Sequence, residues 1–239
     1  MPDRPADLRL AVTGTDTSVG KTLVTCALVA ALRAQGLTVA PMKPVETGIT
    51  ERHAGTDAER LRRAAGGAHA AADVCPVTYA EPLAPLVAAE RAGRPVDWRA
   101  VEAARARLEA GAEAFVVEGA GGLLVPFARG GDGVIDFAAL AGRWALDLVV
   151  VAADRLGVLN HALLTVREAE RRGLRVRAVV LNAVRPTPGD VAEVTNLKVL
   201  GVLLPRVPVL AFPFVPAERR DDLVHLAERG APLAELLGG

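Results

Sequence analysis

The chain has 239 residues, 51% of them hydrophobic, and its 28 basic residues balance its 28 acidic ones. This length allows a large core in one or two domains, and zero net charge without a basic block argues against nucleic acid or an anionic membrane surface as the main partner. No apolar run is long enough to span a bilayer, and residues 1–10 lack the apolar stretch of a signal peptide. Cys26 and Cys75 are isolated in the sequence. We therefore expect a cytoplasmic protein with buried, reduced thiols.

A Gly-Lys-Thr sequence stands between an apolar run and a stretch rich in Ala, Leu and Val. Leu8–Val12 predicts a strand and residues 22–34 predict a helix, with Thr13-Gly14-Thr15-Asp16-Thr17-Ser18-Val19-Gly20-Lys21-Thr22 between them. This order is typical of a phosphate-binding loop, in which backbone N–H groups converge on an anion. Lys21 would add a positive charge for the β- and γ-phosphates, and the Thr22 hydroxyl is placed to ligate Mg²⁺.

This loop departs in one place from the common pattern G-x-x-x-x-G-K-[ST]. Thr15 holds the position of the first glycine, and Gly14 comes one residue early. An ordinary strand–turn–helix is the alternative interpretation, although the flanking strand and helix favour a phosphate site.

A second lysine follows the next predicted strand. Residues 37–42 predict a strand that runs into Lys43-Pro44-Val45-Glu46-Thr47-Gly48. Only three of the 28 basic residues are lysines; Lys21 and Lys43 come directly after predicted strands, whereas Lys198 is expected to be a solvated helix residue. Because ligands of an open parallel sheet bind at the carboxyl ends of its strands, we expect the two lysines to converge on one polyanion.

Two acidic residues are candidate metal ligands. Glu118 ends the apolar strand 114–118, before Gly119-Ala120-Gly121-Gly122, which is the usual second Mg²⁺ position beside a phosphate loop; an exposed strand end is the alternative. Asp57 follows Thr56, a fair N-cap with Glu59 at the capping-box position. These residues, the Thr56 cluster, either cap a helix or direct Asp57 at Mg²⁺, and the local sequence favours neither role.

Two later strands also end in polar segments. The apolar run 146–152 predicts a buried parallel strand, and the segment 154–161 opens a helix to about residue 172. Gly157 and the first helical N–H groups could hold a substrate carboxylate, while His161 is interpreted as a packing or capping residue rather than a catalytic base. The strand 176–181 ends in Asn182, whose amide could match the edge of adenine or form a turn.

The remaining segments continue an alternation of strands and helices. We expect helices over 86–91, 98–110, 134–143, 189–199, 221–229 and 233–237, a last strand over 207–211 and a rigid loop at 213–216. No linker, repeat or charge block interrupts them. The sequence therefore predicts a single doubly wound α/β domain over residues 1–239, with a mainly parallel sheet flanked by helices, as in P-loop NTPases.

Several of these motifs, taken in order, resemble those of the dethiobiotin synthetases. Residues 13–22 look like the opening of that family, including its displaced glycine, and residues 43–48 are similar to its K-P-V-x-[ST]-G. Further similar segments are 80–85, 93–95, 118–122 and 156–161, so the resemblance runs from about residue 10 to 215.

The resemblance implies ATP-dependent ureido-ring closure in biotin biosynthesis, with ATP and Mg²⁺ required and 7,8-diaminononanoate and CO₂ as substrates. A carbamate of the diamine would attack the γ-phosphate of ATP, and the second amine would close the resulting mixed anhydride and release phosphate. Such a reaction needs charge neutralisation and positioning more than covalent help from the protein. The resemblance also implies a homodimer.

The resemblance assigns roles to individual residues. Lys21 would hold the phosphates and Lys43 the carbamate and γ-phosphate, and Mg²⁺ would be surrounded by Thr22, Asp57 and Glu118. The nucleotide would be bound by Thr17, Ser18, Val19, Gly20, Lys21, Thr22, Leu23, Asp57, Glu118, Gly119, Ala120, Gly121, Asn182, Ala183, Pro213, Phe214 and Val215. The diamine would contact Thr13, Lys43 and Thr47, and its carboxylate tail would be held at the helix start of a partner subunit by Gly157, Val158 and Asn160. An acid after the last strand would bind ribose, for which Glu218 and Asp221 are both near; Glu46 has no assigned role.

Three other functions fit parts of the pattern. A partner-regulated switch ATPase would carry a second lysine where this chain has Asp16, and would need a basic amphipathic C-terminal helix to bind a membrane, which the sequence lacks. The ligase half of a glutamine-dependent amidotransferase would need a glutaminase domain and a cysteine nucleophile, and we expect neither here. A non-catalytic nucleotide-binding module is the remaining alternative.

Overall fold

The computed structural model describes residues 8–51, 55–131, 133–186 and 191–238. Its centre is a six-stranded sheet in the order β10-β9-β8-β1-β5-β2, in which neighbouring strands run parallel. In chain order the strands are β1 (Leu8–Gly14), β2 (Val39–Met42), β5 (Ala114–Gly122), β8 (Asp147–Ala153), β9 (Val176–Asn182) and β10 (Val209–Phe212). Their Val, Ala and Leu side chains are mostly buried, as expected for strands covered on both faces.

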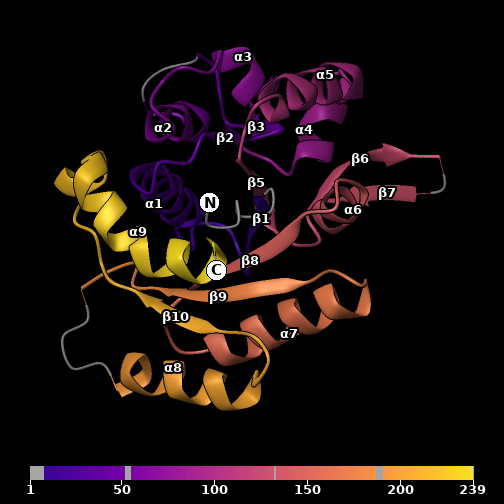
Figure 1. Cartoon of the computed structure of the whole chain (residues 1–239). Coiled ribbons are helices and arrows are strands. Elements are labelled where there is room, and N and C mark those ends of the chain that lie inside the picture. Colours follow the sequence, from indigo (N-terminus) through magenta and orange to yellow (C-terminus); the bar gives the residue numbers. More distant parts are fainter. Residues whose placement is uncertain (1–7, 52–54, 132, 187–190, 239) are drawn as a thin grey trace.

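Helices cover both faces of this sheet (Figure 1). Two of them, α1 (Lys21–Ala34) and α9 (Leu223–Gly238), pack against each other on one side, and α7 (Val158–Arg171) and α8 (Val191–Leu203) lie on the other. The other helical elements are α2 (Asp57–Ala64), α3 (Ala71–Val74), α4 (Pro85–Arg91), α5 (Trp98–Glu109), α6 (Phe137–Arg143) and the 3₁₀ turn η1 (Ala217–Arg219). The predicted doubly wound α/β architecture is confirmed. For α8, positions 189 and 190 of the predicted helix lie outside the described residues.

The prediction of one helix over 134–143 is wrong for its first residues. β7 (Gly133–Asp136) pairs antiparallel with β6 (Pro126–Gly130) in a hairpin that projects from the body of the molecule (Figure 1). Its β-branched residues Val134 and Ile135 suit a strand. The helix begins only after Asp136, whose carboxylate accepts a hydrogen bond from the Ala139 N–H at 2.8 Å.

A small parallel sheet was not predicted. β3 (Val45–Thr47) pairs with β4 (Val77–Tyr79). Strands of three residues are too short to show an alternating pattern, so these positions look like loops in the sequence. The pairing matters for function, because β3 fixes the chain directly after Lys43.

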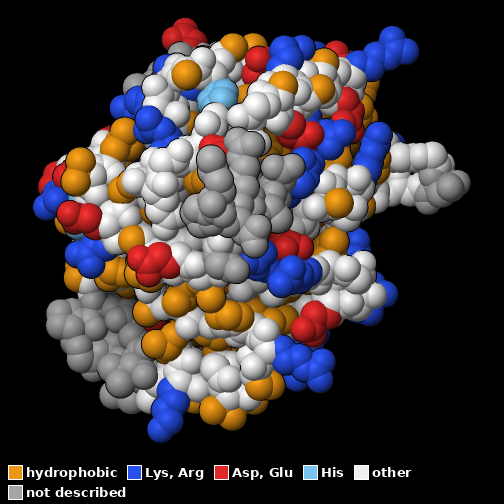
Figure 2. Space-filling view, in the orientation of Figure 1, with side chains coloured by type: hydrophobic (Ala, Val, Ile, Leu, Met, Phe, Trp, Pro, Cys, Tyr) orange, Lys and Arg blue, Asp and Glu red, His pale blue; other side chains and the backbone are white. Residues whose placement is uncertain are grey.

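The predicted break between two C-terminal helices is absent, and α9 runs through Pro232. Gly230 lies directly on α1, since a Cβ atom there would be 2.1 Å from the carbonyl oxygen of Ala27. This close packing supports the helix where the proline lacks an N–H donor. None of the helices in the described ranges is both long and apolar enough to cross a membrane. Figure 2 shows charged side chains of both signs interspersed on one face, in keeping with the balanced charge.

Candidate active site

The loop between β1 and α1 has the geometry of a phosphate-binding loop. Ser18 and Gly20 adopt positive φ angles of 56° and 88°. A Cβ atom on Gly14 would lie 2.7 Å from the carbonyl oxygen of Asp16 and 3.0 Å from Nζ of Lys21. Gly14 therefore supplies the close backbone approach that the first glycine of the common pattern gives, one residue earlier.

Lys21 stands at the start of α1, inside this loop. Its Nζ donates to the carbonyl oxygen of Asp16 at 3.1 Å, and the residue is only 8% exposed. Burial lowers the pKa of Lys21, an effect that the negative charge of Glu118 partly opposes. No side chain caps the start of α1, so its first N–H groups are available to an anion.

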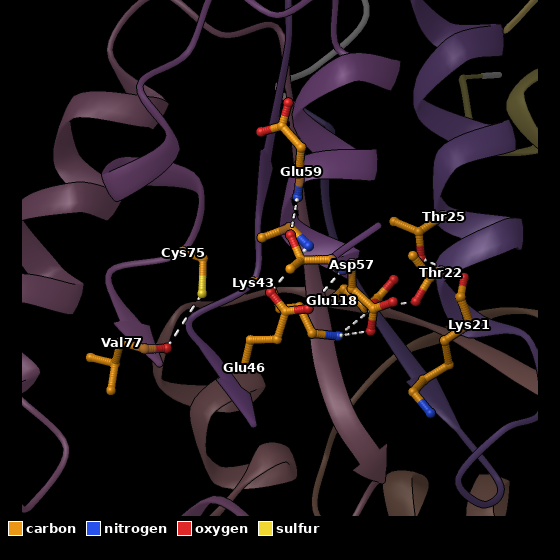
Figure 3. Close-up of polar contacts among 12 residues, drawn as sticks. Lys21, Thr22, Thr25, Lys43, Glu46, Asp57, Glu59, Cys75, Val77 and Glu118 are labelled. Atoms are coloured by element: carbon orange, nitrogen blue, oxygen red, sulfur yellow. Dashed lines mark hydrogen bonds and ion pairs between the residues drawn. The ribbon is translucent and has the colours of Figure 1, made fainter. Parts of the chain in front are cut away.

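Lys43 lies between two carboxylates at the centre of the site (Figure 3). Its Nζ is 2.5 Å from Oε1 of Glu118 and 2.9 Å from Oδ2 of Asp57. The Thr22 hydroxyl donates to the same Glu118 oxygen at 3.0 Å. Burial alone would lower the pKa of Lys43, but Glu118 and Asp57 outweigh it and raise that pKa above its usual value, so Lys43 is a cation.

Asp57 is ionised at neutral pH. Partial burial alone would raise its pKa, but Lys43 and the Thr22 hydroxyl hold the pKa of this carboxyl below its usual range. Thr56 is the predicted N-cap, because its Oγ1 accepts the Glu59 N–H at 3.3 Å. The carboxylate of Asp57 faces Lys43, and its role toward Mg²⁺ stays a prediction. The Glu59 carboxylate, however, pairs with Arg62 rather than closing a capping box.

Glu118 is not the exposed end of its strand. The side chain is 0% exposed, and β5 continues to Gly122, which pairs with Gly14 across an irregularity in the ladder. The prediction that the strand stops at Glu118 is therefore wrong, and the glycines extend the sheet instead of forming a turn. Glu118 lies opposite Val12 in register, beside the strand that carries the phosphate loop.

One hydroxyl and two carboxylates are available to a metal ion here, from Thr22, Asp57 and Glu118. Within the described part of the chain, Oε2 of Glu118 is buried without a hydrogen-bond partner, a costly arrangement that a cation would relieve. No cluster of three or more His, Cys, Asp or Glu side chains forms a metal site among the described residues. Mg²⁺ in nucleotide sites uses few protein carboxylates together with phosphates and water, so this donor set fits Mg²⁺.

These side chains surround a cavity of about 460 Å³ at the carboxyl edge of the sheet. The structure brings together at its wall most of the predicted site residues: Thr17, Ser18, Gly20, Lys21, Thr22, Leu23, Lys43, Thr47, Asp57, Ala120, Gly121, Asn182, Ala183 and Val215. Loops that follow four different strands therefore meet at one site, as the strand-end argument predicts.

The other predicted residues lie outside this lining. Thr13, Val19, Glu118 and Gly119 are buried behind it, and Pro213 and Phe214 follow β10. Gly157, Val158 and Asn160 lie at the start of α7. His161, predicted to pack or to cap the helix, is exposed, and no described side chain caps this helix start. Glu218 is exposed on η1, and Asp221 pairs with Arg63 at 3.1 Å and Arg60 at 3.6 Å.

Asn182 braces the phosphate loop from the end of β9. Its Nδ2 donates to the carbonyl oxygen of Val19 at 2.9 Å, and a Cβ atom on Gly20 would lie 2.1 Å from the same Nδ2. Its Oδ1 is buried and has no partner in the described ranges. A turn-forming role does not account for these contacts, and they leave the acceptor capacity of Oδ1 unused.

Four residues of the cavity wall were not predicted from the sequence: Glu46, Arg60, Val184 and Arg220. Arg60 could have been found, because it follows Asp57 by three residues and so shares its helix face. The other three carry no local signal. Arg220 is turned toward the cavity by a contact from its Nε to the carbonyl oxygen of Val215 at 3.2 Å.

A phosphate loop lies between a parallel strand and a helix, beside a second lysine that follows β2 and two carboxylates, one on β5 and one at the start of α2. This arrangement defines a P-loop nucleotide-binding enzyme. Residues 9–213 match a family model described as an AAA domain. The "ATP-dependent dethiobiotin synthetase BioD" of Anaeromyxobacter dehalogenans (strain 2CP-C) is 48% identical over 87% of this chain and 90% of its own length. Two proteins of the same name are also similar. The one from Rhodococcus jostii (strain RHA1) is 43% identical over 80% of this chain and 84% of its own length. The one from Bacillus subtilis (strain 168) is 33% identical over 95% of this chain and 96% of its own length. The chain belongs to the ATP-dependent dethiobiotin synthetases, a family of ligases that form C–N bonds.

Proposed function

We propose that this protein closes the ureido ring of dethiobiotin from 7,8-diaminononanoate and CO₂, at the expense of ATP. The observation that carries the proposal is the convergence of Lys21, Lys43, Asp57 and Glu118 beside one phosphate loop. Membership of the dethiobiotin synthetase family supports the choice of substrates.

The reaction balances without a covalent enzyme intermediate. One amine of the substrate adds to CO₂ and loses a proton, giving a carbamate. A carbamate oxygen attacks the γ-phosphorus as ADP leaves, and the second amine then attacks the carbonyl carbon. The C–O bond to phosphate breaks, phosphate leaves with that oxygen, and a second proton is lost. Each step places anions close together, so positioning and positive charge are the main demands on the protein.

The residues of the site supply that charge. The open N–H groups at the start of α1 and the ammonium of Lys21 would bind the β- and γ-phosphates. Lys43, a buried cation, would lie between the γ-phosphate and the carbamate and stabilise the charge that builds up there. Thr22, Asp57 and Glu118 would hold Mg²⁺, which when bound neutralises charge on the β- and γ-phosphates.

The ends of the substrates would be recognised elsewhere. The free Oδ1 of Asn182 suits the amino group of adenine. We also propose a homodimer, in which Gly157, Val158 and Asn160 of one subunit hold the carboxylate tail in the site of the other.

Mass spectrometry tests the proposed reaction. The protein is incubated with Mg-ATP, 7,8-diaminononanoate and ¹³C-bicarbonate. We expect a product with the mass of the cyclic urea that carries the ¹³C atom, and none when ATP is omitted. A carbamate that accumulates without ring closure, or no labelled product, would contradict the proposal.

A further inference from the structure

Glu46 is a buried acid whose carboxylate is bound to the backbone of another element. It lies on β3 and is 5% exposed. Its Oε1 accepts the N–H of Asp57 at 2.7 Å, and its Oε2 accepts the N–H of Ala58 at 3.2 Å. Both oxygens of one side chain therefore hold the first turn of α2, eleven residues further along the chain (Figure 3).

The start of α2 depends on these bonds. The first N–H groups of a helix have no partner within the helix. Here Glu46 takes the N–H groups of Asp57 and Ala58, and Thr56 Oγ1 takes that of Glu59. A carboxylate at this end of a helix is also favoured by the helix dipole.

The first residue of that helix is the acid that faces Lys43. The carboxylate of Asp57 is 2.9 Å from Nζ of Lys43, and Lys43 is held in turn by Glu118 on the central sheet. Glu46 and Asp57 are eleven residues apart, and the hydrogen bond between them joins β3 directly to the start of α2. Among the described contacts, Lys43 and the Thr22 hydroxyl hold the side chain of Asp57, and Glu46 holds its backbone N–H.

We infer that Glu46 is a positioning residue: it fixes the first turn of α2 and thereby sets the carboxylate of Asp57 opposite Lys43 and Glu118, where it can bind Mg²⁺. The inference rests on the proposed function in one respect, that Asp57 is a metal ligand. Two other roles are open to an acid in this cavity wall, a direct contact with the nucleotide and direct ligation of the metal. Neither is favoured here, because both oxygens already accept backbone N–H groups.

The test compares Glu46→Gln with Glu59→Gln as the matched control. Glu59 lies on the same helical turn, but its carboxylate pairs with Arg62 and is outside the cavity wall. Calorimetry measures ADP binding across a Mg²⁺ titration and again in EDTA, and amide hydrogen exchange is followed at Asp57 and Ala58. Because ADP binding needs no ring closure, these readings do not depend on the proposed reaction.

For Glu46→Gln we expect an apparent Mg²⁺ affinity about tenfold weaker, the lower end for loss of a residue that orients a metal ligand. ADP affinity in EDTA should stay unchanged, and the two amides should exchange faster because one N–H loses its acceptor. Glu59→Gln should change neither. If Glu46→Gln fails to fold, Glu46→Asp withdraws the carboxylate by one methylene and should weaken Mg²⁺ in the same direction.

Three results would overturn the inference. Unchanged Mg²⁺ affinity with faster exchange would make Glu46 a helix cap with no influence on the site. Unchanged exchange would show that it does not hold the helix turn. Weaker ADP binding in EDTA would make it a direct nucleotide contact.

Discussion

Replacing Asn182 by alanine tests whether one side chain both braces the phosphate loop and faces the base. The variant removes the buried bond from Nδ2 to the Val19 carbonyl and the contact beneath Gly20. A buried group left without its partner costs about 1–3 kcal/mol. Part of this cost falls on the protein whether or not a ligand is bound. We therefore expect the binding free energy for the phosphate chain to weaken by about 1 kcal/mol, which is roughly fivefold in affinity.

The decisive ligand is one with phosphates but no base. Magnesium tripolyphosphate cannot contact Oδ1 of Asn182 through an adenine, so its binding reports the phosphate loop alone. We expect Asn182→Ala to weaken tripolyphosphate about fivefold in calorimetry and to weaken ATP further. Val215→Ala is the control, because Val215 is a buried residue of the cavity wall outside the phosphate loop. It should leave tripolyphosphate binding unchanged.

An Asn182→Ala protein that binds tripolyphosphate as well as the parent, while ATP binding falls, would refute the bracing role and leave base recognition alone. A thermal melt of each variant separates this outcome from general unfolding.

Three other changes probe the site. Lys43→Gln should lower kcat by about 10²- to 10³-fold while ADP still binds; near-normal turnover would remove Lys43 from the chemistry. Gly20→Ala should abolish tight ATP binding in calorimetry, because the new Cβ would meet Nδ2 of Asn182 at 2.1 Å and alanine disfavours a φ of 88°; normal binding would contradict the loop geometry. The pKa of Asp57 is lowered in the folded protein, so its contribution to stability is present above the ordinary carboxyl pKa of about 3.9 and is lost as pH falls through the folded value. The Tm gap between the parent and Asp57→Asn should therefore close below about pH 4, and a gap that persists there would count against the Lys43 ion pair.

Local signals made much of the fold predictable. The phosphate loop, the buried parallel strands and the strand-end lysines each follow from a pattern within about ten residues, and the parallel-sheet rule then brings their loops to one edge. Thr56 and Asp57 show the same logic at closer range, since a cap and a site carboxylate can be neighbours in one helical turn.

Features that depend on pairing between distant segments could not be predicted. The β3–β4 sheet consists of two three-residue strands, and such a pair is not stable without packing against the rest of the protein. Glu46 holds the variable position of the segment 43–48, so the motif gives it no role. The role that we infer comes from α2 backbone groups that folding brings to it. The direct ion pair between Lys43 and Glu118 joins residues 75 positions apart, and the sequence places both at the site without showing that they touch.

Release of phosphate from Mg-ATP, measured with and without 7,8-diaminononanoate and bicarbonate, distinguishes a synthetase from the alternative functions. We expect rapid release only when both the diamine and bicarbonate are present, with one phosphate for each cyclic urea formed. Release that proceeds equally well without the diamine, or no release under any condition, would contradict this expectation and favour a switch ATPase or a non-catalytic nucleotide-binding protein.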